Sequence, residues 1–585
     1  MLRGNDLNLG SDSQTRSPVT LSREARSTHV YVSGATGTGK SKFLEHLIWQ
    51  DIVAWPKSKC GMLVLDPHGS LYDNIMARLA WHDYPEGTRR PIVPIDLRRD
   101  DWIIAYNLLR EREGGDPAVI IDGFVQAIAH VWGREGTTET PLFARWIGRI
   151  FDVLYEKKLT LVEAEHLTNI VDKSLRRELT RGLKSRGTSQ DWAFADTLSP
   201  KDLDTQFSST LNRLAPFLKT GVLRKMFGQD KLSLDLNESL REAQIIIVNL
   251  SPAGGRVSEN NASLFATLLL SDLWTAARQR GKPRDSRDLR PFYVYIDEAQ
   301  RCLTPSIAQN LDEARGYGLH LTLANQYPRQ FLHAGGVNGE RIYDSVMVNA
   351  RTKIAFAMEG GEENMRPIAE SLFMGVMSPD KVKHELYSTK VMDYSEETRI
   401  VKSRSRSHGF SEGMHSGKAG GLGAGGTENF ADYDDMEPTS RSESTSQFAS
   451  RSSAQTEGSS QSDTEGDSEV PMLIPQMGKE LSSVQFEPLE EQLFRAMASL
   501  HDQEQRKFCT RIVGSKVPVC VTTPLIRPAA SSKERIEKYV LKLLRRQPFA
   551  LLRSEAERSM ARREKKIAEL INTGSMEPTA ARRPL

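Results

Sequence analysis

An eight-residue loop near the start of the chain constrains the fold more than any other feature. Residues 34 to 41 read GATGTGKS and satisfy the phosphate-loop pattern G-x-x-x-x-G-K-[ST] at every fixed position. Glycines let backbone N–H groups turn inward around phosphates, the lysine reaches the β and γ phosphates, and the hydroxyl coordinates Mg²⁺. We predict binding of ATP or GTP, with ATP and Mg²⁺ as the expected pair, by Gly34, Ala35, Thr36, Gly37, Thr38, Gly39, Lys40 and Ser41.

The segments on either side of the loop fit this interpretation. His29 to Val32 suits a strand, and an amphipathic helical pattern follows, with Leu44, Leu47, Ile48 and Ile52 on one face. The N-terminus of that helix would hold the anion.

A dinucleotide-binding turn is the main alternative, because SGATG also opens the nucleotide loop of extended short-chain dehydrogenases. Those reductases need a Tyr-x-x-x-Lys pair. None of the fourteen tyrosines here has a lysine four residues downstream, so this alternative fails.

Composition is that of an ordinary globular protein of 585 residues, long enough for two to four domains. No apolar stretch reaches about 18 residues, and the longest candidate, Asn261 to Arg280, is interrupted by polar residues and predicts a buried helix. No signal peptide or membrane anchor is recognisable, and the four cysteines form no C-x-x-C pair. We expect a cytoplasmic location, with any inner-membrane contact made through partners.

Charge is distributed unevenly. Residues 427 to 469 contain eleven Asp or Glu against two Arg, a net charge of −9, although the whole chain carries +2. Residues 531 to 585 contain fourteen Lys or Arg against seven Glu, a net charge of +7. The basic tail fits either a nucleic-acid contact or a solvated helix.

Alternating strand and helix patterns indicate a mostly parallel sheet. The predicted fold is α/β, a RecA-like phosphate-loop NTPase (ASCE) core with an inserted all-α domain and a disordered Ser/Gly/acidic loop. Further helices are expected at Asn260 to Gln279 and Ser306 to Tyr317. The strands expected after the first one are Met62 to Leu65, Ile92 to Ile95, Ile245 to Leu250, Phe292 to Ile296, Leu319 to Ala324 and Lys353 to Phe356.

The domain order follows from these patterns. The expected helices of the insertion are Ala118 to Val131, Pro141 to Tyr155, Leu161 to Asp172 and Lys201 to Leu218. The chain would return to the core through a helix at Glu487 to Leu500 and a hairpin of Phe508 to Val513 with Val517 to Val521. The expected boundaries are a polar N-terminal extension (1–27), the first part of the core (28–105), the helical insertion (106–242), the second part of the core (243–402), a disordered loop (403–470), the return to the core (471–527) and a basic helical tail (528–585).

A hydrophobic strand ending in two acids supplies the second element that a phosphate-loop hydrolase needs. Asp297 and Glu298 follow Phe292 to Ile296. We predict that Asp297, with Ser41, orients Mg²⁺ and that Glu298 polarises the attacking water as a general base. The wide separation of Lys40 and Asp297 argues against a small GTPase or nucleoside kinase and is explained by the helical insertion.

The order GATGTGKS, LVLDPHGS, helical insertion, YVYIDEAQ, EARGYGLHLTLANQ resembles the HerA/FtsK superfamily of ring-shaped DNA-pumping ATPases, in particular the TraG/TraD-like type IV coupling proteins of conjugation. The likeness runs from about Thr28 to Phe356 and more weakly to about Pro524. It implies that Arg315 is an arginine finger reaching the ATP of a neighbouring subunit and that Gln326 senses the γ-phosphate. Asp66 stands where relatives carry an acid ahead of a lysine-glycine pair, but His68 replaces the lysine.

The resemblance implies an ATPase ring, expected to be a homo-hexamer, that moves DNA mainly through backbone contacts in conjugative or type IV secretion-related transfer. Two alternatives stay open: a HerA-like translocase or helicase working with a nuclease in end processing or phage defence, and a type IV secretion ATPase that moves protein. Candidate partners are a relaxase, a nuclease or a secretion-channel protein. Coupling proteins commonly begin with transmembrane helices and HerA proteins with a small β-barrel, whereas about 27 polar residues precede the first expected strand here.

Overall fold

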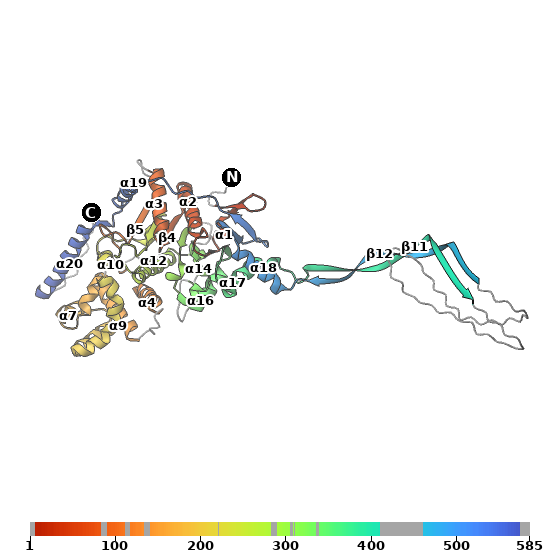
Figure 1. Ribbon diagram of the computed structural model, residues 1–585. Helices are drawn as coiled ribbons and strands as arrows, with labels where there is room; N and C mark the ends of the chain where they lie inside the picture. Colours follow the sequence, from red (N-terminus) through yellow and green to blue (C-terminus); the bar gives the residue numbers. More distant parts are fainter. Residues whose placement is uncertain are drawn as a thin grey trace, which may run out of the picture. The chain divides into compact units, whose positions relative to one another are not determined.

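The computed structural model describes residues 6–83, 91–110, 117–133, 141–219, 221–281, 289–304, 308, 311–334, 339–409 and 460–573. The chain divides into two compact units (Figure 1). Unit 1 comprises Met1–Met377 and Leu489–Leu585, and unit 2 comprises Ser378–Pro488. The phosphate loop and the acidic pair belong to unit 1.

Unit 1 is built on an eleven-stranded sheet whose larger part is parallel, as predicted. The seven strands from β10 to β5 in the spatial order are parallel to one another, and the other four, together with the β10–β13 junction, pair antiparallel. In spatial order the strands are β2 (Pro18–Leu21), β1 (Leu7–Asp12), β14 (Val519–Thr522), β13 (Lys507–Arg511), β10 (Thr352–Phe356), β3 (Val30–Ser33), β9 (Leu319–Asn325), β8 (Phe292–Ile296), β4 (Gly61–Asp66), β7 (Ile245–Asn249) and β5 (Ile92–Asp96).

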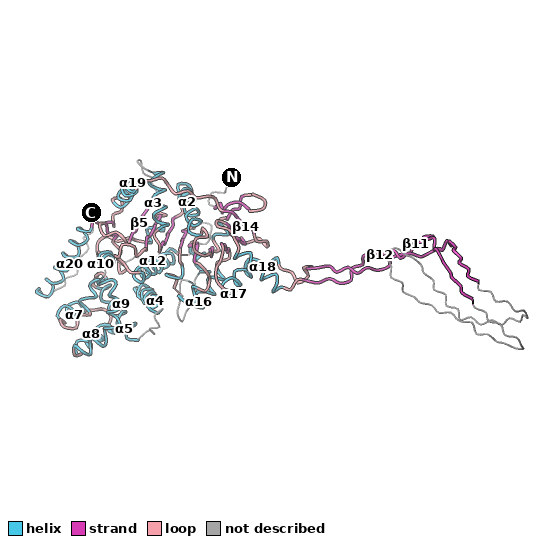
Figure 2. The backbone as a smooth tube through the Cα atoms, in the orientation of Figure 1, coloured by secondary structure: helices cyan, strands magenta, loops and turns pink. Residues whose placement is uncertain are grey.

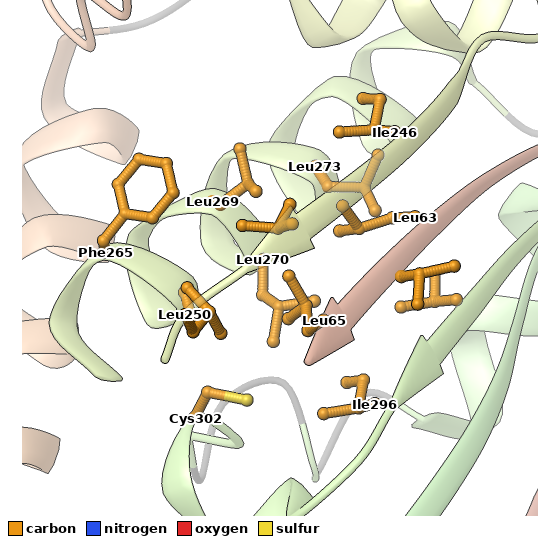
Figure 3. Packing of buried hydrophobic residues seen from close by; sticks show 14 of the residues in the cluster. Leu63, Leu65, Ile246, Leu250, Phe265, Leu269, Leu270, Leu273, Ile296 and Cys302 are labelled. Carbon is orange, nitrogen blue, oxygen red and sulfur yellow. The ribbon is translucent and has the colours of Figure 1, made fainter. Parts of the chain in front are cut away.

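The central strands read as unbroken apolar runs because both faces of the sheet are covered. Every residue of β3, β4, β7, β8, β9 and β10 is buried. Helix α12 (Glu259–Arg280), the predicted buried helix, covers part of one face. Its Leu273 lies beside Leu63 and Ile246 of the sheet (Figure 3), whereas its Phe265 packs against Tyr106 and Phe227.

The described residues between Tyr106 and Glu242 form helices, as predicted for the insertion, and several lie together in Figure 2. The aromatic rings of Trp146, Trp192 and Phe207 form a small core there, with centroids 4.8–5.9 Å apart. The helices are α4 (Pro117–Gly133), α5 (Pro141–Glu156), α6 (Ala164–Leu167), α7 (Ser174–Thr180), α8 (Arg186–Thr197), α9 (Pro200–Lys219), α10 (Gly221–Phe227) and α11 (Leu236–Arg241).

One predicted helix of this region is shorter than expected. Instead of a helix over Leu161–Asp172, the chain makes a 3₁₀ turn at Leu161–Glu163 and then α6. Asn169 ends the helical run, since its side-chain oxygen accepts hydrogen bonds from the backbone N–H groups of Val171 and Asp172. Such local side-chain bonds compete with helix continuation.

The C-terminal segment packs on the core and on the insertion. It forms α19 (Lys533–Leu544), β15 (Ala550–Leu552) and α20 (Arg553–Thr573), and β15 pairs with β6 (Trp102–Ile104). Arg563 of α20 donates to the buried carboxylate of Glu163 at 2.7 Å, and Arg535 of α19 donates to the Ala80 carbonyl at 2.8 Å. Part of the predicted basic tail is therefore engaged in intramolecular contacts.

The expectation of a polar extension over residues 1–27 is wrong, because β1, β2 and the short helix α1 (Arg23–Arg26) lie in this stretch. Leu7, Leu9 and Leu21 are buried, and β1 joins the sheet beside β14. Two short strands with so few apolar residues give a weak alternating pattern. Gly10, at φ +136°, permits the close approach, since a Cβ there would lie 2.3 Å from the Thr522 carbonyl oxygen.

Unit 2 contains a two-stranded antiparallel ribbon, β11 (Val382–Gly409) and β12 (Ser460–Phe486). Residues 403–409 and 460–470, expected to be disordered, belong to these strands, and residues 471–486, expected in the core, belong to β12. Residues 410–459 lie outside the described residues. Composition misled because Ser, Gly and charged residues dominate this stretch, a composition typical of disordered segments, although its two halves pair in the structure.

Other elements match the predictions closely. The helix predicted after residue 487 is α18 (Leu489–His501), and the predicted hairpin is β13 with β14. The helix expected at Ser306–Tyr317 is described only as α14 (Leu311–Ala314) and a 3₁₀ turn at Arg315–Tyr317. The four cysteines, which all lie within the described residues, form no disulfide. Among the described residues, no helix combines the length and apolar character needed to cross a membrane.

A buried histidine at the start of β3 makes this fold sensitive to acid. His29 Nδ1 accepts a hydrogen bond from Leu321 N (3.1 Å), so its proton is on Nε2, which lies 2.5 Å from the Leu311 carbonyl oxygen. Burial lowers the pKa of His29 to about 4, although the Leu311 carbonyl opposes the shift. The ordinary value near 6.5 applies to the unfolded chain, so the unfolded chain binds more protons between these values.

We predict that stability is lost as the pH falls from about 6.5 to 4, with His29 accounting for about 3 kcal/mol of the loss. His29→Asn removes the titrating group while tolerating the positive backbone φ of 60°. Urea unfolding of wild type and variant across this pH range tests the prediction. Equal pH slopes for the two proteins would contradict it.

Candidate nucleotide-binding site

The phosphate loop connects the end of β3 to the start of α2 (Lys40–Ser58), as the sequence predicts. Its glycines have distinct roles. Gly37 and Gly39 adopt φ values of +84° and +110°, which side chains with a Cβ rarely take. Gly34 is required by space instead, because a Cβ there would lie 2.6 Å from the Cβ of Phe356.

Neighbouring strands fix the position of the loop. Gly34 N donates to the Gln326 carbonyl at the end of β9 (3.2 Å), and Ala35 N donates to the Ala357 carbonyl after β10 (2.8 Å). The parallel register places Ser33 between Ala355 of β10 and Asn325 of β9. The loop therefore emerges at the edge of the sheet where parallel strands end and where α/β proteins bind ligands.

A second contact to the loop comes from a segment that sequence analysis missed. Arg506 N donates to the Thr38 carbonyl, and Gln505 Nε2 donates to the Gly37 carbonyl, each at 2.9 Å. These residues lie between α18 and β13, more than 460 positions along the chain from the loop. No sequence pattern indicates this contact. Arg506 has a positive φ of 71°, but this is visible in the structure and not in the sequence.

The predicted acidic pair follows β8 and meets the loop. Lys40 Nζ lies 3.5 Å from Glu298 Oε1, and Ser41 Oγ donates to Asp297 Oδ2 at 3.3 Å. All except Ser41 are buried. Glu298 has left-handed backbone angles (φ 48°, ψ 53°), which turn the chain directly after the strand. Gln300 Nε2 donates to the other oxygen of Glu298 at 2.7 Å, a contact that sequence analysis also missed.

Burial and neighbouring charges push the two carboxyl groups in opposite directions. Burial raises the pKa of Asp297, and the charge of Lys40 only partly opposes this. Burial also acts to raise the pKa of Glu298, but His68, the Lys40 charge and Gln300 outweigh it and lower the pKa to about 2. Glu298 is therefore held ionised.

Asp66 and His68, at the end of β4, have different roles. Asp66 is buried and accepts hydrogen bonds from His68 N (3.0 Å) and Tyr72 N (2.8 Å), which supports the first turn of α3 (Ser70–Asp83). His68 Nε2 lies 3.7 Å from Glu298 Oε1, and this contact raises the pKa of His68. The histidine that replaces the lysine of relatives thus faces the acidic pair, whereas Asp66 is committed to the backbone.

Gln326 and Arg315 lie beyond opposite ends of the central strand β9. Gln326 directly follows β9 and contacts the phosphate loop through its carbonyl. Arg315 is exposed and precedes β9, whose seven residues span roughly 20 Å. The Arg315 guanidinium therefore does not join the constellation formed by Lys40, Ser41, Asp297 and Glu298 within one chain.

The donor set of the site fits a nucleotide with Mg²⁺. Within the described residues, no group of three or more His, Cys, Asp or Glu side chains could hold a metal alone. Mg²⁺ characteristically takes one or two protein ligands and completes its shell with water and phosphate oxygens. Ser41 and Asp297 supply that kind of partial set.

The fold and site define an α/β phosphate-loop nucleotide-binding protein. Residues 7–98 match the family model described as the central domain of helicase HerA. This match confirms the predicted resemblance over the first strands of the sheet, including the phosphate loop. It also includes β1 and β2, which sequence analysis had placed outside the core.

Solved structures similar to this chain have low sequence identity to it. One is an unbound form of the bacterial conjugative coupling protein TrwB (13% identity, TM-score 0.44, 87% of this chain and 88% of that chain). Another is plasmid coupling protein TrwB in complex with ADP and Mg²⁺ (13%, 0.44, 89% and 92%). A third is VirB4 of Thermoanaerobacter pseudethanolicus (14%, 0.38, 62% and 87%). No curated protein matches the chain.

The space around each glycine predicts opposite effects for two glycine-to-alanine changes, one in the phosphate loop and one in a helix of the insertion. Gly34→Ala forces β3 and β10 apart and should lower stability by roughly 1–3 kcal/mol and weaken nucleotide binding. Gly148→Ala, inside α5 with no atom within 4 Å of the added Cβ, should raise stability by roughly 0.5–1 kcal/mol. Thermal unfolding with and without nucleotide measures both. Unchanged stability and affinity in Gly34→Ala would refute the packing argument.

Proposed function

We propose that this chain is an ATP-hydrolysing motor of the HerA type that assembles into a ring and moves DNA. The convergence of Lys40 and Ser41 on Glu298 and Asp297, at 3.5 Å and 3.3 Å, carries the proposal. A loop that binds phosphates beside two buried acids has the parts for hydrolysis, because one acid can hold the metal shell and the other can orient water.

Each side chain has a physical task in this scheme. When bound, Mg²⁺ neutralises charge on the β and γ phosphates, and Ser41 with Asp297 would hold it. Lys40 would exchange its contact with Glu298 for the phosphates. That exchange removes one of the charges that lower the pKa of Glu298 and makes its carboxylate a stronger acceptor for a proton of the attacking water.

Gln326 would sense the γ-phosphate. Its support is positional, since Gln326 follows β9 directly and its carbonyl is bonded to the first glycine of the loop. A change in the loop on nucleotide binding would therefore reach Gln326 through the backbone.

Arg315 would act on the nucleotide of a neighbouring copy. Its place at the opposite end of β9 prevents a role at its own site, and a planar guanidinium is suited to stabilising charge on transferring phosphoryl oxygens. A site completed by a neighbour links hydrolysis to assembly, which is why we propose a ring, with a homo-hexamer as the expected form.

DNA is the proposed cargo, gripped mainly through its phosphates, in a role like that of the coupling proteins of conjugation or type IV secretion. The helical insertion at 106–242 would choose a relaxase-like partner or cargo. Two alternatives are a HerA-like translocase working with a nuclease and a secretion ATPase moving protein. Only the DNA-moving functions require DNA to stimulate turnover.

Turnover measurements test the catalytic assignment. Lys40→Ala should abolish ATP binding and hydrolysis, because it removes the cation that meets the phosphates. Glu298→Gln should retain binding but lose at least about 100-fold in turnover. Lys57→Ala, an exposed position near the end of the same helix, is the matched control and should behave as wild type. Robust turnover by Lys40→Ala or Glu298→Gln would contradict the catalytic assignment. If DNA does not change the turnover of the wild type, DNA is not the cargo.

A mixing experiment tests the role of Arg315 in trans. Arg315→Ala and Lys40→Ala chains should each be inactive alone. When equal amounts are mixed under exchange conditions, roughly a quarter of the sites would combine an intact Lys40 with an intact neighbouring Arg315. ATP turnover should recover to a similar fraction of the wild-type rate. No recovery in rings shown to contain both chains would rule out action in trans.

A further inference from the structure

Among the described strands, the ribbon of unit 2 has two edges that no other strand pairs with. Among the described strands, β11 and β12 pair only with each other, over 28 and 27 residues. Figure 1 shows them running side by side as a long two-stranded ribbon. Each strand therefore presents one row of backbone N–H and C=O groups to its surroundings, which is a template for pairing with another strand.

Apolar side chains along this ribbon are exposed although they stand opposite one another. Tyr387 faces Leu481 in register, and Val391 faces Met477. Leu481 and Met477 are 49% and 62% exposed, and Tyr387 is 55% exposed. Further exposed apolar residues of the ribbon are Val382, Leu386, Met392, Tyr394, Ile400, Val470, Leu473 and Phe486.

An isolated two-stranded ribbon is marginally stable in water, and stability normally requires a third strand or a packed face. Large groups of exposed apolar side chains on a soluble protein mark a surface that another molecule covers. Both arguments apply to the ribbon at once. Its covering partner must supply strand edges as well as apolar contact.

The charges of the two strands select the partner. β11 contains six Lys or Arg and four Asp or Glu, a net charge of +2, and β12 contains one Lys and five Asp or Glu, a net charge of −4. Two copies meeting through the same strand would bring like charges together. Contact between β11 of one copy and β12 of the next brings opposite charges together, and it is antiparallel when the copies are related by rotation.

We propose that ribbons of neighbouring copies pair edge to edge, β11 of one chain with β12 of the next, into a continuous antiparallel sheet that closes around a ring. Rotational repetition of one head-to-tail contact closes such an assembly and leaves no free strand edge. This proposal rests on the ring of the proposed function and not on its ATP chemistry. DNA is the poorer occupant, since the net charge of β12 repels phosphates.

Deleting the ribbon tests this assembly contact. Lys381 O accepts a hydrogen bond from Glu487 N at 2.8 Å, so a two-residue Asn-Gly turn can replace residues 382–486 without moving the ends. We expect sedimentation and native mass spectrometry to show that self-association weakens at least about tenfold. ATP binding by the loop should be unchanged, which shows that unit 1 is folded. An unaltered oligomer after deletion would overturn the proposal, as would a wild-type chain that stays monomeric.

A charge exchange distinguishes pairing between copies from stability within one ribbon. The first variant carries Arg399→Glu and Lys402→Glu on β11, which changes its net charge from +2 to −2. The second carries Glu465→Lys, Asp467→Lys and Glu469→Lys on β12, which changes its net charge from −4 to +2. Each alone should fail to assemble, because like charges would meet between copies. Mixing the two should restore assembly, since acidic β11 then meets basic β12 and the unmodified strands also match.

Lys402 stands opposite Asp467 in the same chain, so each variant keeps like charges opposite each other within its own ribbon. Recovery in the mixture therefore requires contact between chains. Failure of the mixture to assemble would overturn edge pairing. These outcomes are independent of catalysis, so loss of the ATPase assignment with restored assembly would leave the inference standing.

Discussion

The parallel pairing of β3 between β10 and β9 is the constraint on which the rest of the site depends. It brings Ser33 level with Ala355 and Asn325, so the loop that follows leaves the sheet between two fixed strand ends. The space there admits no Cβ at Gly34. Backbone hydrogen bonds from Gly34 and Ala35 to the residues after these strands then fix the position of the loop without any side chain. Nucleotide affinity in this protein is therefore tied to sheet packing.

A second constraint is electrostatic. Lys40, Asp297 and Glu298 are all buried, and burying isolated charges is costly. Contacts within the cluster reduce that cost. The pKa of Asp297 is raised and that of Glu298 is lowered, so the neighbouring positive charges favour the ionised form of Glu298 more than that of Asp297. A second buried pair, Arg26 and Asp51 at 2.6 Å, contacts the Tyr295 hydroxyl of β8, which accepts a hydrogen bond from Arg26 and donates one to Asp51. Removing any one partner from such a cluster leaves a buried charge exposed to an apolar surrounding.

Sequence predicted what depends on local pattern and failed where distant segments meet. GATGTGKS and the apolar run before Asp297 identified the loop, the strand and the acids, because each needs only neighbours in sequence. Gln505 and Arg506 reach the loop from the far end of the chain, and no short pattern encodes that contact. Part of the ribbon was missed for another reason: residues 403–409 and 460–470 are rich in Ser, Gly and charged residues, so their composition resembles that of a segment without structure.

Two features of the chain call for a neighbouring copy, and they arise from different physics. Arg315 is a solvent-exposed cation at the end of β9 opposite the phosphate loop, and among the described residues none forms an ion pair with it. Among the described residues, the ribbon presents unpaired strand edges and exposed apolar side chains. A ring satisfies both needs, since each copy then supplies a guanidinium to one neighbour and a strand edge to each side. The two contacts differ in salt sensitivity. Charge selects the partner strand of the ribbon, but backbone hydrogen bonds and apolar contact, which salt does not screen, also hold it, whereas the contribution of Arg315 rests on charge alone. Assembly through the ribbon would therefore persist at ionic strengths that weaken the contribution of Arg315, leaving rings that are intact but slow.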